Sequence, residues 1–393
     1  MFDSSHVIVM GKNYSTSLGV IRALGTAGYK CIAVQVSRKK QKIKTPELFS
    51  RYVEKYYLAF GDCEKEVLQI LDTLSDGGRK LIIPIDDYSA YILDRHYDSL
   101  AGRFFLPSVN QTGGALIELM KKDRQKEIAA GSDIRCAKSF ILNRNGQKQF
   151  ELTPGLPFPC FVKPNISAVT NKNSIQRCDS PEELKSVLDS VSAGVSSVLA
   201  EEFLEITNEY VICGLSLGGY KVIIPGMIKK TKVGEGSLKG ITAKGIPVHG
   251  KQYSELLKQL EGMISDIHLT GLFDIEIIES GGQFYFNELN LRNGAAGYAY
   301  TANGVNLPAI YADYVIHGTE VPNECLIKSE NDFVSEKVEM DSFAGRHISF
   351  REMLRDIRSA KVRFIKVSSD KKPYLHFLKF SLVKVLAKHG ISD

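Results

Sequence analysis

The sequence has few of the features that mark special classes of protein. Its 393 residues include only 13 prolines and 33 glycines, and 44% are hydrophobic, so wholesale disorder, collagen and low-complexity repeats are excluded. The 50 basic residues barely exceed the 45 acidic ones, and a net charge of +5 does not indicate nucleic-acid binding. No uninterrupted apolar run approaches the ~18 residues that span a membrane. What remains is a globular chain with length for roughly two or three domains.

Signals for secretion and for disulfide bonding are absent as well. The first six residues contain no cationic start, no apolar core and no cleavage site of a secretory signal. The seven cysteines are odd in number and include no Cys-x-x-Cys pair. This usage favours reduced, buried thiols over a disulfide framework or a metal site. We therefore expect a cytoplasmic protein.

The N-terminal part of the chain alternates short apolar strands with helices. We expect strands at residues 6–11 and 30–36, separated by a polar loop at 12–17 and a helix that begins at Leu18. A strand, a helix and a strand in this order indicate a parallel sheet. No Gly-x-Gly-x-x-Gly sequence follows the first strand, so a dinucleotide site is not expected.

Charged residues follow the next strands, and they allow more than one interpretation. The basic run at 38–44 is either a solvated loop or a site for a polyanion. The strand at 80–85 closes on Asp86 and Asp87. Asp87 either caps the next helix or faces a ligand at the carboxyl end of the sheet. A single helix that carries several lysines is expected at 113–130.

Antiparallel hairpins dominate the middle of the chain. One hairpin is expected from strands 209–217 and 220–228, and another from strands 271–278 and 283–290, each with glycines at its turn. The lysine-rich segment 229–232 and the segment 237–240 are interpreted as a mobile solvated loop, and the alternative is a lid that supplies a lysine to phosphates. The fold class is therefore α/β in the first part of the chain and α+β in the second.

The second hairpin carries the most informative pattern of the sequence. Residues two apart in a strand share one face, so Glu288 and Asn290 point the same way, and Arg292 continues the row if the strand persists. The partner strand offers Asp274 and Glu276 on the corresponding face. A sheet gains nothing from clustered acids unless a positive group neutralises them. Hard oxygen ligands in such a partly open cluster suit Mg²⁺.

The run from Glu288 to Arg292 also resembles the E-x-N-x-R signature of the ATP-grasp enzymes. Other landmarks similar to those of that family follow in its order: Lys122, Phe161-Val162-Lys163-Pro164, Glu201-Glu202-Phe203-Leu204 and Glu209. The similarity covers about residues 5–320. Within the family the chain most resembles the D-aspartate ligase branch of the carboxylate–amine ligases, on account of residues 290–294 and 303–307.

The resemblance implies an arrangement of domains. A Rossmann-like N-terminal domain would occupy residues 1–110, and an ATP-grasp domain would follow at 111–320. The ATP-grasp domain would consist of two α+β subdomains, a small one at about 135–200 and a large one at about 201–320. A short C-terminal extension would complete the chain at 321–393.

The resemblance also implies how phosphates and metal would be held. Lys122 and Lys163 would bind the phosphates of ATP. Glu276, Glu288 and Asn290 would hold two Mg²⁺ ions that bridge those phosphates, with Mn²⁺ as a substitute.

Further roles follow from the same resemblance. Adenine would lie against the backbone of Glu201, Glu202, Phe203 and Leu204. Glu209 would bind the ribose hydroxyls, and the catalytic residues would be Lys163 and Arg292, whose guanidinium would hold an acyl phosphate or oxyanion. The flap at 165–173 lacks the glycine of many relatives, and Lys172 is its candidate phosphate contact.

The implied activity is that of an ATP-dependent ligase that joins a small-molecule carboxylate to an amine, with no nucleic acid as partner. Two other classes stay open: a non-catalytic nucleotide sensor or scaffold on the same fold, and a small-molecule kinase. A homodimer is compatible with the sequence. The tail at 375–388 is apolar with spaced lysines, and it is either a helix packed on the body or an interfacial helix on an anionic membrane.

Overall fold

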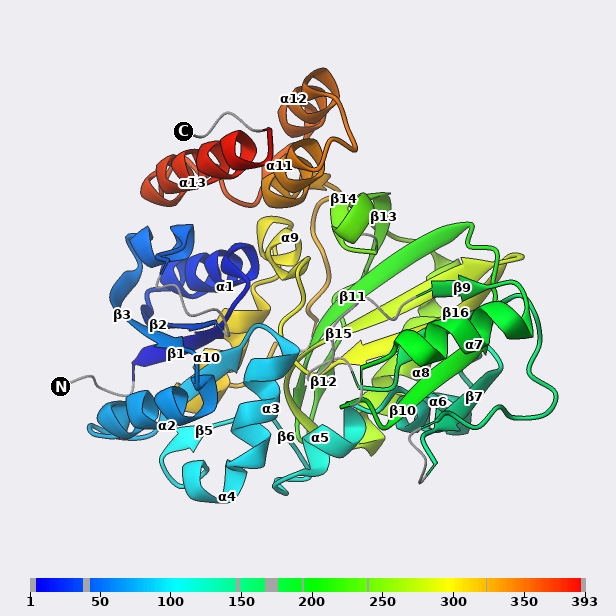
Figure 1. Cartoon of the computed structure of the whole chain (residues 1–393). Coiled ribbons are helices and arrows are strands. Elements are labelled where there is room, and N and C mark those ends of the chain that lie inside the picture. Colours follow the sequence, from blue (N-terminus) through cyan, green and yellow to red (C-terminus); the bar gives the residue numbers. More distant parts are fainter. Residues whose placement is uncertain are drawn as a thin grey trace.

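The residues that the computed structural model describes form three β-sheets, with helices that connect and cover them (Figure 1). It describes residues 5–37, 43–145, 149–166, 176–192, 194–238, 240–322 and 324–389. Much of the basic run at 38–44 and of the flap at 165–173, including Lys172, lies outside the described residues.

The first sheet is parallel, as predicted, and its five strands stand in the order β3-β2-β1-β4-β5. Its strands are β1 (His6–Gly11), β2 (Lys30–Ser37), β3 (Val53–Phe60), β4 (Lys80–Pro84) and β5 (Phe104–Phe105). The helices of this region are α1 (Tyr14–Thr26), the 3-10 turn η1 (Pro46–Phe49), α2 (Cys63–Leu74), α3 (Asp87–Arg95) and α4 (Tyr97–Leu100).

Two helix starts differ from the prediction. Helix α1 begins at Tyr14 rather than Leu18, because the side chain of Asn13 caps it where a loop was expected. The cap of α3 is Asp86, whose carboxylate accepts a backbone hydrogen bond from the first turn. The interpretation of Asp87 as a cap is therefore wrong, and its side chain is available for another role.

The second sheet is antiparallel, and its four strands stand in the order β7-β10-β8-β9. Its elements are β7 (Ser139–Asn143), β8 (Cys160–Pro164), β9 (Gln176–Cys178), α7 (Pro181–Ser190) and β10 (Ser197–Glu202). Before it, the single helix predicted at 113–130 is two helices, α5 (Ala115–Leu119) and α6 (Lys122–Gly131). The break occurs at Lys121, whose backbone is extended.

The third sheet is the largest, with nine strands. Its main order is β16-β15-β11-β13-β14-β17-β18, with β12 beside β11 and β6 beside β15. Its strands are β6 (Ser108–Val109), β11 (Asn208–Leu217), β12 (Val222–Ile223), β13 (Met227–Val233), β14 (Thr242–Val248), β15 (Leu269–Ser280), β16 (Gln283–Asn290), β17 (Phe333–Val334) and β18 (Val362–Arg363). The short helix η3 (Gly236–Leu238) and the helices α8 (Lys251–Asp266), α9 (Gly297–Ala302) and α10 (Leu307–His317) accompany it.

The lysine-rich segment 229–232 is part of this sheet. It lies within β13, which pairs with both β11 and β14. The prediction of a mobile solvated loop is therefore wrong, because pairing on both sides holds the strand and buries Lys230.

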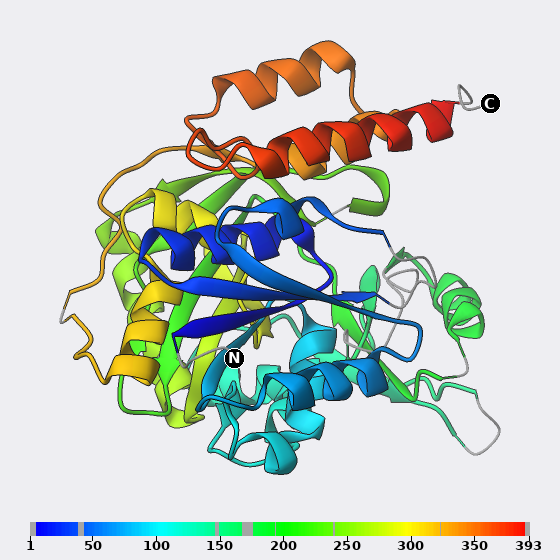
Figure 2. The same ribbon diagram turned by 90° about the vertical axis from the view of Figure 1, so that its left-hand side faces the viewer.

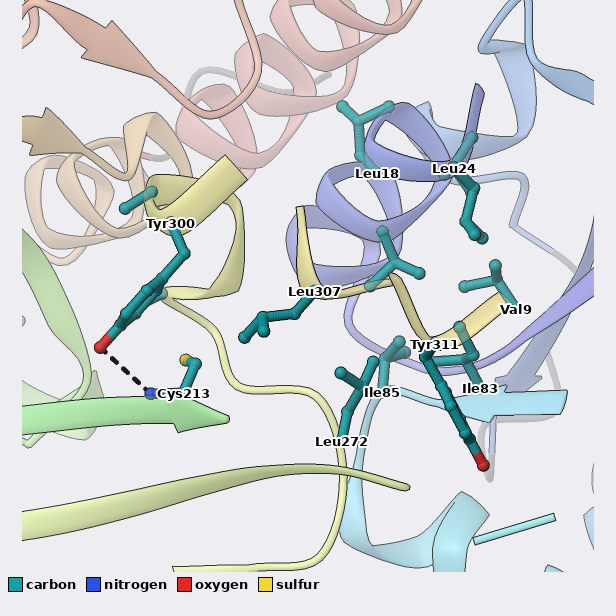
Figure 3. Packing of buried hydrophobic residues seen from close by; sticks show 14 of the residues in the cluster. Val9, Leu18, Leu24, Ile83, Ile85, Cys213, Leu272, Tyr300, Leu307 and Tyr311 are labelled. Atoms are coloured by element: carbon teal, nitrogen blue, oxygen red, sulfur yellow. Dashed lines mark hydrogen bonds between the residues drawn. The ribbon is translucent and has the colours of Figure 1, made fainter. Parts of the chain in front are cut away.

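A shared hydrophobic core joins the first sheet to the third. Val9 and Ile83 of the parallel sheet belong to the same buried cluster as Leu272 of β15 (Figure 3). The Tyr300 hydroxyl accepts a hydrogen bond from the Cys213 backbone N–H, which fixes α9 against β11 (Figure 3). The carboxyl ends of β1 and β4 are thus held against the large sheet.

The C-terminal part of the chain forms an outer layer of three helices. These are α11 (Glu336–Ala344), α12 (Phe350–Ser359) and α13 (Lys372–His389). Both views show them along one side of the molecule, beyond α1 (Figure 1, Figure 2). Within the described ranges, no helix combines the length and apolar character needed to cross a membrane.

Candidate functional site

The hairpin of β15 and β16 has the register that the alternation predicts. Asp274 lies opposite Asn290, and Glu276 lies opposite Glu288. The apolar residues between them enter a buried core on the other side of the sheet. The hairpin therefore presents a row of oxygen ligands on one face, because that core occupies the other.

A β-bulge adds one more side chain to this face. The ladder skips Asn287 between Phe286 and Glu288. Phe286 and Leu289 both enter the core although they are three residues apart, since the bulge shifts the alternation. Asn287 turns to the site, where its Oδ1 accepts a hydrogen bond from Lys163 Nζ at 3.1 Å. Nothing in the sequence signals this bulge.

Three residues of helix α6 contact other residues of the site. Lys122 forms an ion pair with Glu288, and Lys126 forms one with Glu201 at 2.6 Å. Between them, Gln125 Nε2 donates to the carbonyl of Leu289 at 2.7 Å, and Gln125 Oε1 accepts from the Leu289 N–H at 2.9 Å. The spacing of these three residues puts them on one helical face, a signal that the sequence analysis did not use.

The Lys122 contact determines the charge of Glu288, the first candidate metal ligand. Burial opposes ionisation of Glu288, but the neighbouring Lys122 ammonium lowers the pKa of this carboxyl to about 2. Glu288 is therefore a carboxylate at neutral pH, as a metal ligand must be.

Lys163 and Glu201 come from neighbouring strands of the second sheet. Lys163 Nζ lies 2.9 Å from Glu201 Oε2, and both side chains are buried. Burial opposes the charge of Glu201, but the ammonium groups of Lys163 and Lys126 hold the pKa of Glu201 below its usual range. Burial lowers the pKa of Lys163, an effect that Glu201 partly offsets. The side chain of Glu201 thus organises two lysines, a role that the sequence analysis did not foresee.

Lys230 enters the site from β13. Its Nζ lies 3.0 Å from Glu209 Oε2 and 3.4 Å from Glu276 Oε2. Burial disfavours the charge, but these two carboxylates raise the pKa of Lys230 above its usual value. Lys230 therefore links the carboxylate expected at the ribose to a carboxylate expected at the metal. Because the sequence predicted a solvated loop here, Lys230 was not among the predicted site residues.

Arg292 follows the end of β16 and does not continue the strand. Its Nε donates to Asp87 Oδ1 at 3.1 Å, and its Nη1 lies 3.9 Å from Asp274 Oδ1. Burial disfavours the charge, but Asp87 and Asp274 raise the pKa of Arg292 above its usual value. Asp87, at the carboxyl end of the parallel sheet, thus orients a guanidinium of the hairpin.

Asp274 lies opposite Asn290 in the hairpin and orients the Asn290 side-chain amide. Asn290 Nδ2 donates to Asp274 Oδ1 at 3.1 Å, which leaves the amide oxygen of Asn290 free to act as a ligand. Burial raises the pKa of Asp274 to about 6, although Arg292 opposes the shift.

The segment expected at adenine, 201–204, comprises the last two residues of β10 and the two residues after it. Glu202 Oε1 accepts from the Lys138 backbone N–H at 2.8 Å, and the Arg177 guanidinium lies 4.4 Å from the centre of the Phe203 ring. Phe203 and Leu204 are partly exposed, as residues beside a ligand would be. Their contacts place this segment beside the second sheet.

The donor set fits Mg²⁺ rather than a metal caged by protein alone. The face offers two carboxylates and an amide oxygen, from Glu276, Glu288 and Asn290. Among the described residues, no three His, Cys, Asp or Glu side chains gather closely enough to hold a metal ion by themselves. Mg²⁺ commonly uses one or two carboxylates and takes its other ligands from water and phosphates.

Comparisons with known proteins agree on the fold. No protein-family model matches the sequence, and neither does any curated protein sequence. Among solved structures, N5-carboxyaminoimidazole synthetase from Staphylococcus aureus is similar with a TM-score of 0.61 and 16% identity, over 84% of this chain and 82% of that one. L-amino acid ligase from Bacillus licheniformis is similar with a TM-score of 0.60 and 15% identity, over 80% and 75% of the two chains.

A third similar structure was solved with nucleotide. The biotin carboxylase domain of Hydrogenobacter thermophilus 2-oxoglutarate carboxylase, in complex with MgADP, ADP and bicarbonate, has a TM-score of 0.64 and 15% identity, over 84% of this chain and 74% of that one. These structural neighbours are ATP-grasp ligases, and two of them match 84% of this chain. The chain described here has the ATP-grasp fold.

Proposed function

We propose that this protein is an ATP- and Mg²⁺-dependent ligase that activates a carboxylate as an acyl phosphate and joins it to an amine. The observation that carries the proposal is a single sheet face on which Glu276, Glu288 and Asn290 meet Lys122 and Lys163. Hard ligands and phosphate-binding cations at one place are what MgATP requires.

The charges of the site suit this ligand. Lys122, Lys163, Lys230 and Arg292 are each paired with a carboxylate of the site: Glu288 and Glu209 from the large sheet, Glu201 from β10 and Asp87 from α3. ATP carries about four negative charges and two Mg²⁺ ions neutralise them, so bound nucleotide can replace direct ion pairs by phosphate and metal bridges. Such an exchange leaves no buried charge without a partner.

Each residue then has a stated task. Glu276, Glu288 and the amide oxygen of Asn290 would hold Mg²⁺, which when bound would neutralise phosphate charge. Lys122 and Lys163 would bind phosphate oxygens. These roles depend on positioning and charge rather than on a protein nucleophile.

Arg292 would act at the reacting carboxyl group. Its guanidinium, oriented by Asp87, offers a planar fork to an acyl phosphate or to the oxyanion formed when the amine attacks. The attack of the substrate carboxylate on the γ-phosphate forms an acyl C–O–P bond and releases ADP. Attack by the amine then forms the C–N bond and releases phosphate.

The similar structures support this class of reaction. One is an L-amino acid ligase, and another binds MgADP together with bicarbonate. We extend the proposal to the nucleotide contacts of the sequence motifs, with residues 201–204 at adenine and Glu209 at ribose. We also keep the domain limits at about 110 and 320, and a cytoplasmic location that suits the seven free thiols.

Two other functions remain as outcomes of the test. A nucleotide sensor would bind ATP without turnover, and a kinase would form ADP with a carboxylate or hydroxyl substrate and need no amine. The full set of metal ligands and phosphate lysines favours the ligase, because a sensor need not keep both carboxylates.

The test measures phosphate release and product mass with a panel of amino acids as carboxylates, each with and without an amine acceptor. We expect release that depends on both substrates, and a product whose mass equals their sum minus water. Glu288→Gln and Asn290→Ala should abolish it, whereas Gln283→Ala at the exposed hairpin turn should not. Unchanged turnover and MgATP affinity in the first two variants would disprove the assignment.

A further inference from the structure

The net positive charge of the protein is concentrated in its C-terminal segment. Residues 345–393 contain 12 Lys and Arg but only four Asp and Glu, whereas the preceding 344 residues contain 38 and 41. A segment of about one eighth of the chain therefore carries a net charge of +8, and the rest of the chain carries −3. Such an asymmetry indicates a negatively charged partner.

The acids of the described part of this segment are all paired with residues of the body. Asp370 is buried and paired with Arg22 of α1 at 3.0 Å. Glu352 and Asp356 bind Lys232 of β13 at 3.1 and 2.8 Å. The outer surface of the described part of the segment consequently has almost no acid to neutralise its lysines and arginines.

Helix α13 presents an apolar stripe on this cationic surface. Its inner side is anchored by the buried Phe377. On its other side, Leu375, Leu378 and Leu382 are 62%, 40% and 59% exposed. Positions i, i+3 and i+7 lie on one face of a helix, so these leucines form a continuous stripe.

Lysines border the leucine stripe. Lys371, Lys372 and Lys379 are exposed on the same helix and the turn before it. Leucines flanked by lysines are the arrangement with which an interfacial helix enters the boundary between lipid headgroups and acyl chains. A polyanion such as nucleic acid would require the cations but would gain nothing from exposed leucines.

We propose that this face, formed by Leu375, Leu378 and Leu382 with Lys371, Lys372 and Lys379, docks the protein on an anionic lipid bilayer. The helix lies flat on the headgroups, the leucines enter the acyl boundary and the lysines meet the anionic lipids. The ion pairs of the segment with Arg22 and Lys232 fasten the docked face to the body of the enzyme. The inference does not depend on the proposed ligase activity.

The absence of tryptophan from the chain makes a direct test possible. In the full-length protein, Leu375→Trp introduces a single fluorescent reporter on the stripe, and Tyr220→Trp introduces one on an exposed position of the large sheet region (74% exposed). Vesicles of phosphatidylcholine with one quarter phosphatidylglycerol should shift the emission of the first variant to shorter wavelength and leave that of the second unchanged. Vesicles of pure phosphatidylcholine should shift neither.

Flotation with the same vesicles compares the wild type with matched variants. Lys371→Gln/Lys372→Gln/Lys379→Gln should reduce the bound fraction more than about tenfold at 0.1 M salt, as expected for about three lysines at an anionic surface. Leu375→Gln/Leu378→Gln/Leu382→Gln should abolish it. Lys65→Gln/Lys185→Gln/Lys258→Gln, with three exposed lysines on α2, α7 and α8, should bind like the wild type. Circular dichroism and melting temperature verify that each variant folds.

Three results would overturn the proposal. One is wild-type protein that does not float with anionic vesicles. Another is equal flotation of the wild type and the leucine variant, with binding to heparin that depends only on the lysines, which would indicate a polyanion site. The third is a dimer in analytical ultracentrifugation that the leucine variant loses, which would make the stripe a subunit interface.

Discussion

The lysines of the candidate site already form ion pairs with carboxylates. Lys122 contacts Glu288, Lys163 contacts Glu201, and Lys230 spans two carboxylates. Removing one partner of a buried pair leaves a charge without compensation, at a cost of about 3–5 kcal/mol. Substitutions here therefore act on stability as well as on activity, and both have to be measured.

Glu47 in η1 gives a prediction for the pH dependence of stability. Its side chain is buried, burial raises its pKa to about 7, and a hydrogen bond from the Thr45 hydroxyl only partly opposes the shift. Between pH 4.5 and 7 the folded protein binds this proton more tightly than the unfolded chain, so the contribution of Glu47 to stability falls as the pH rises through this window. The loss amounts to at most about 1.4 kcal/mol per pH unit.

The variant Glu47→Gln removes this dependence. We expect it to be more stable than the wild type at pH 8 and to lose that advantage at pH 5, as measured by urea unfolding. The exposed Glu205→Gln serves as the matched control. A stability difference between Glu47→Gln and wild type that does not change with pH would contradict the prediction.

At the scale of elements, helix α6 supports the hairpin of β15 and β16, which carries the proposed metal ligands. β16 is an edge strand of the large sheet, and the side chain of Gln125 pairs with both backbone groups of Leu289 as a neighbouring strand would. Leu289 stands between Glu288 and Asn290, so α6 determines where these two proposed metal ligands lie. Gln125 is a positioning residue by this geometry, since its side chain binds the backbone of Leu119 and Leu289.

Gln125→Met tests this coupling. The change leaves a buried N–H and a buried C=O of Leu289 without partners, which should cost about 1–3 kcal/mol of stability. Because the ligands shift with the strand, the Mg²⁺ concentration that half-saturates ATP binding should rise severalfold, as measured by calorimetry. Arg124→Met, on the exposed side of α6, should change neither quantity. A stability loss with an unchanged Mg²⁺ midpoint would reduce Gln125 to a structural residue.

At the scale of the whole molecule, buried hydrogen bonds join the C-terminal segment to helix α1 near the N-terminus. Arg22 of α1 donates to Asp370 and to the carbonyls of Phe364 and Ile365, and it is almost completely buried. Asp370 also accepts from the Ser50 hydroxyl at 2.8 Å. Because β18 of the same segment pairs with β17 and so extends the large sheet, this network connects the first and third sheets.

Asp370→Asn should therefore destabilise the whole fold. It leaves the buried Arg22 cation without a counter-charge, so we expect a loss of about 3–5 kcal/mol in urea unfolding. Asp179→Asn breaks an exposed pair with Arg177 and should cost less than about 1 kcal/mol. Equal effects of the two changes would show that the buried network does not hold the segment.

The sequence allowed prediction of the features that depend on local alternation. The parallel strands at the N-terminus and the facing rows of Asp274, Glu276, Glu288 and Asn290 follow from the periodicity of apolar residues, because one face of each strand must enter a core. The order of the motifs indicated the ATP-grasp fold, which the structural neighbours confirm. These features can be predicted because they depend on residues that are close together in the sequence.

Tertiary structure alone decided which charges meet. Lys126, Lys163 and Glu201 come from a helix and two strands far apart in sequence, and Lys230 reaches the site only because β13 is paired on both sides. The bulge places Phe286 and Leu289 in the core and Asn287 beside Lys163, so it depends on how the hairpin packs against both. The physical reason is that a strand's periodicity determines which face a side chain occupies, whereas its ionic partner depends on how separate elements pack.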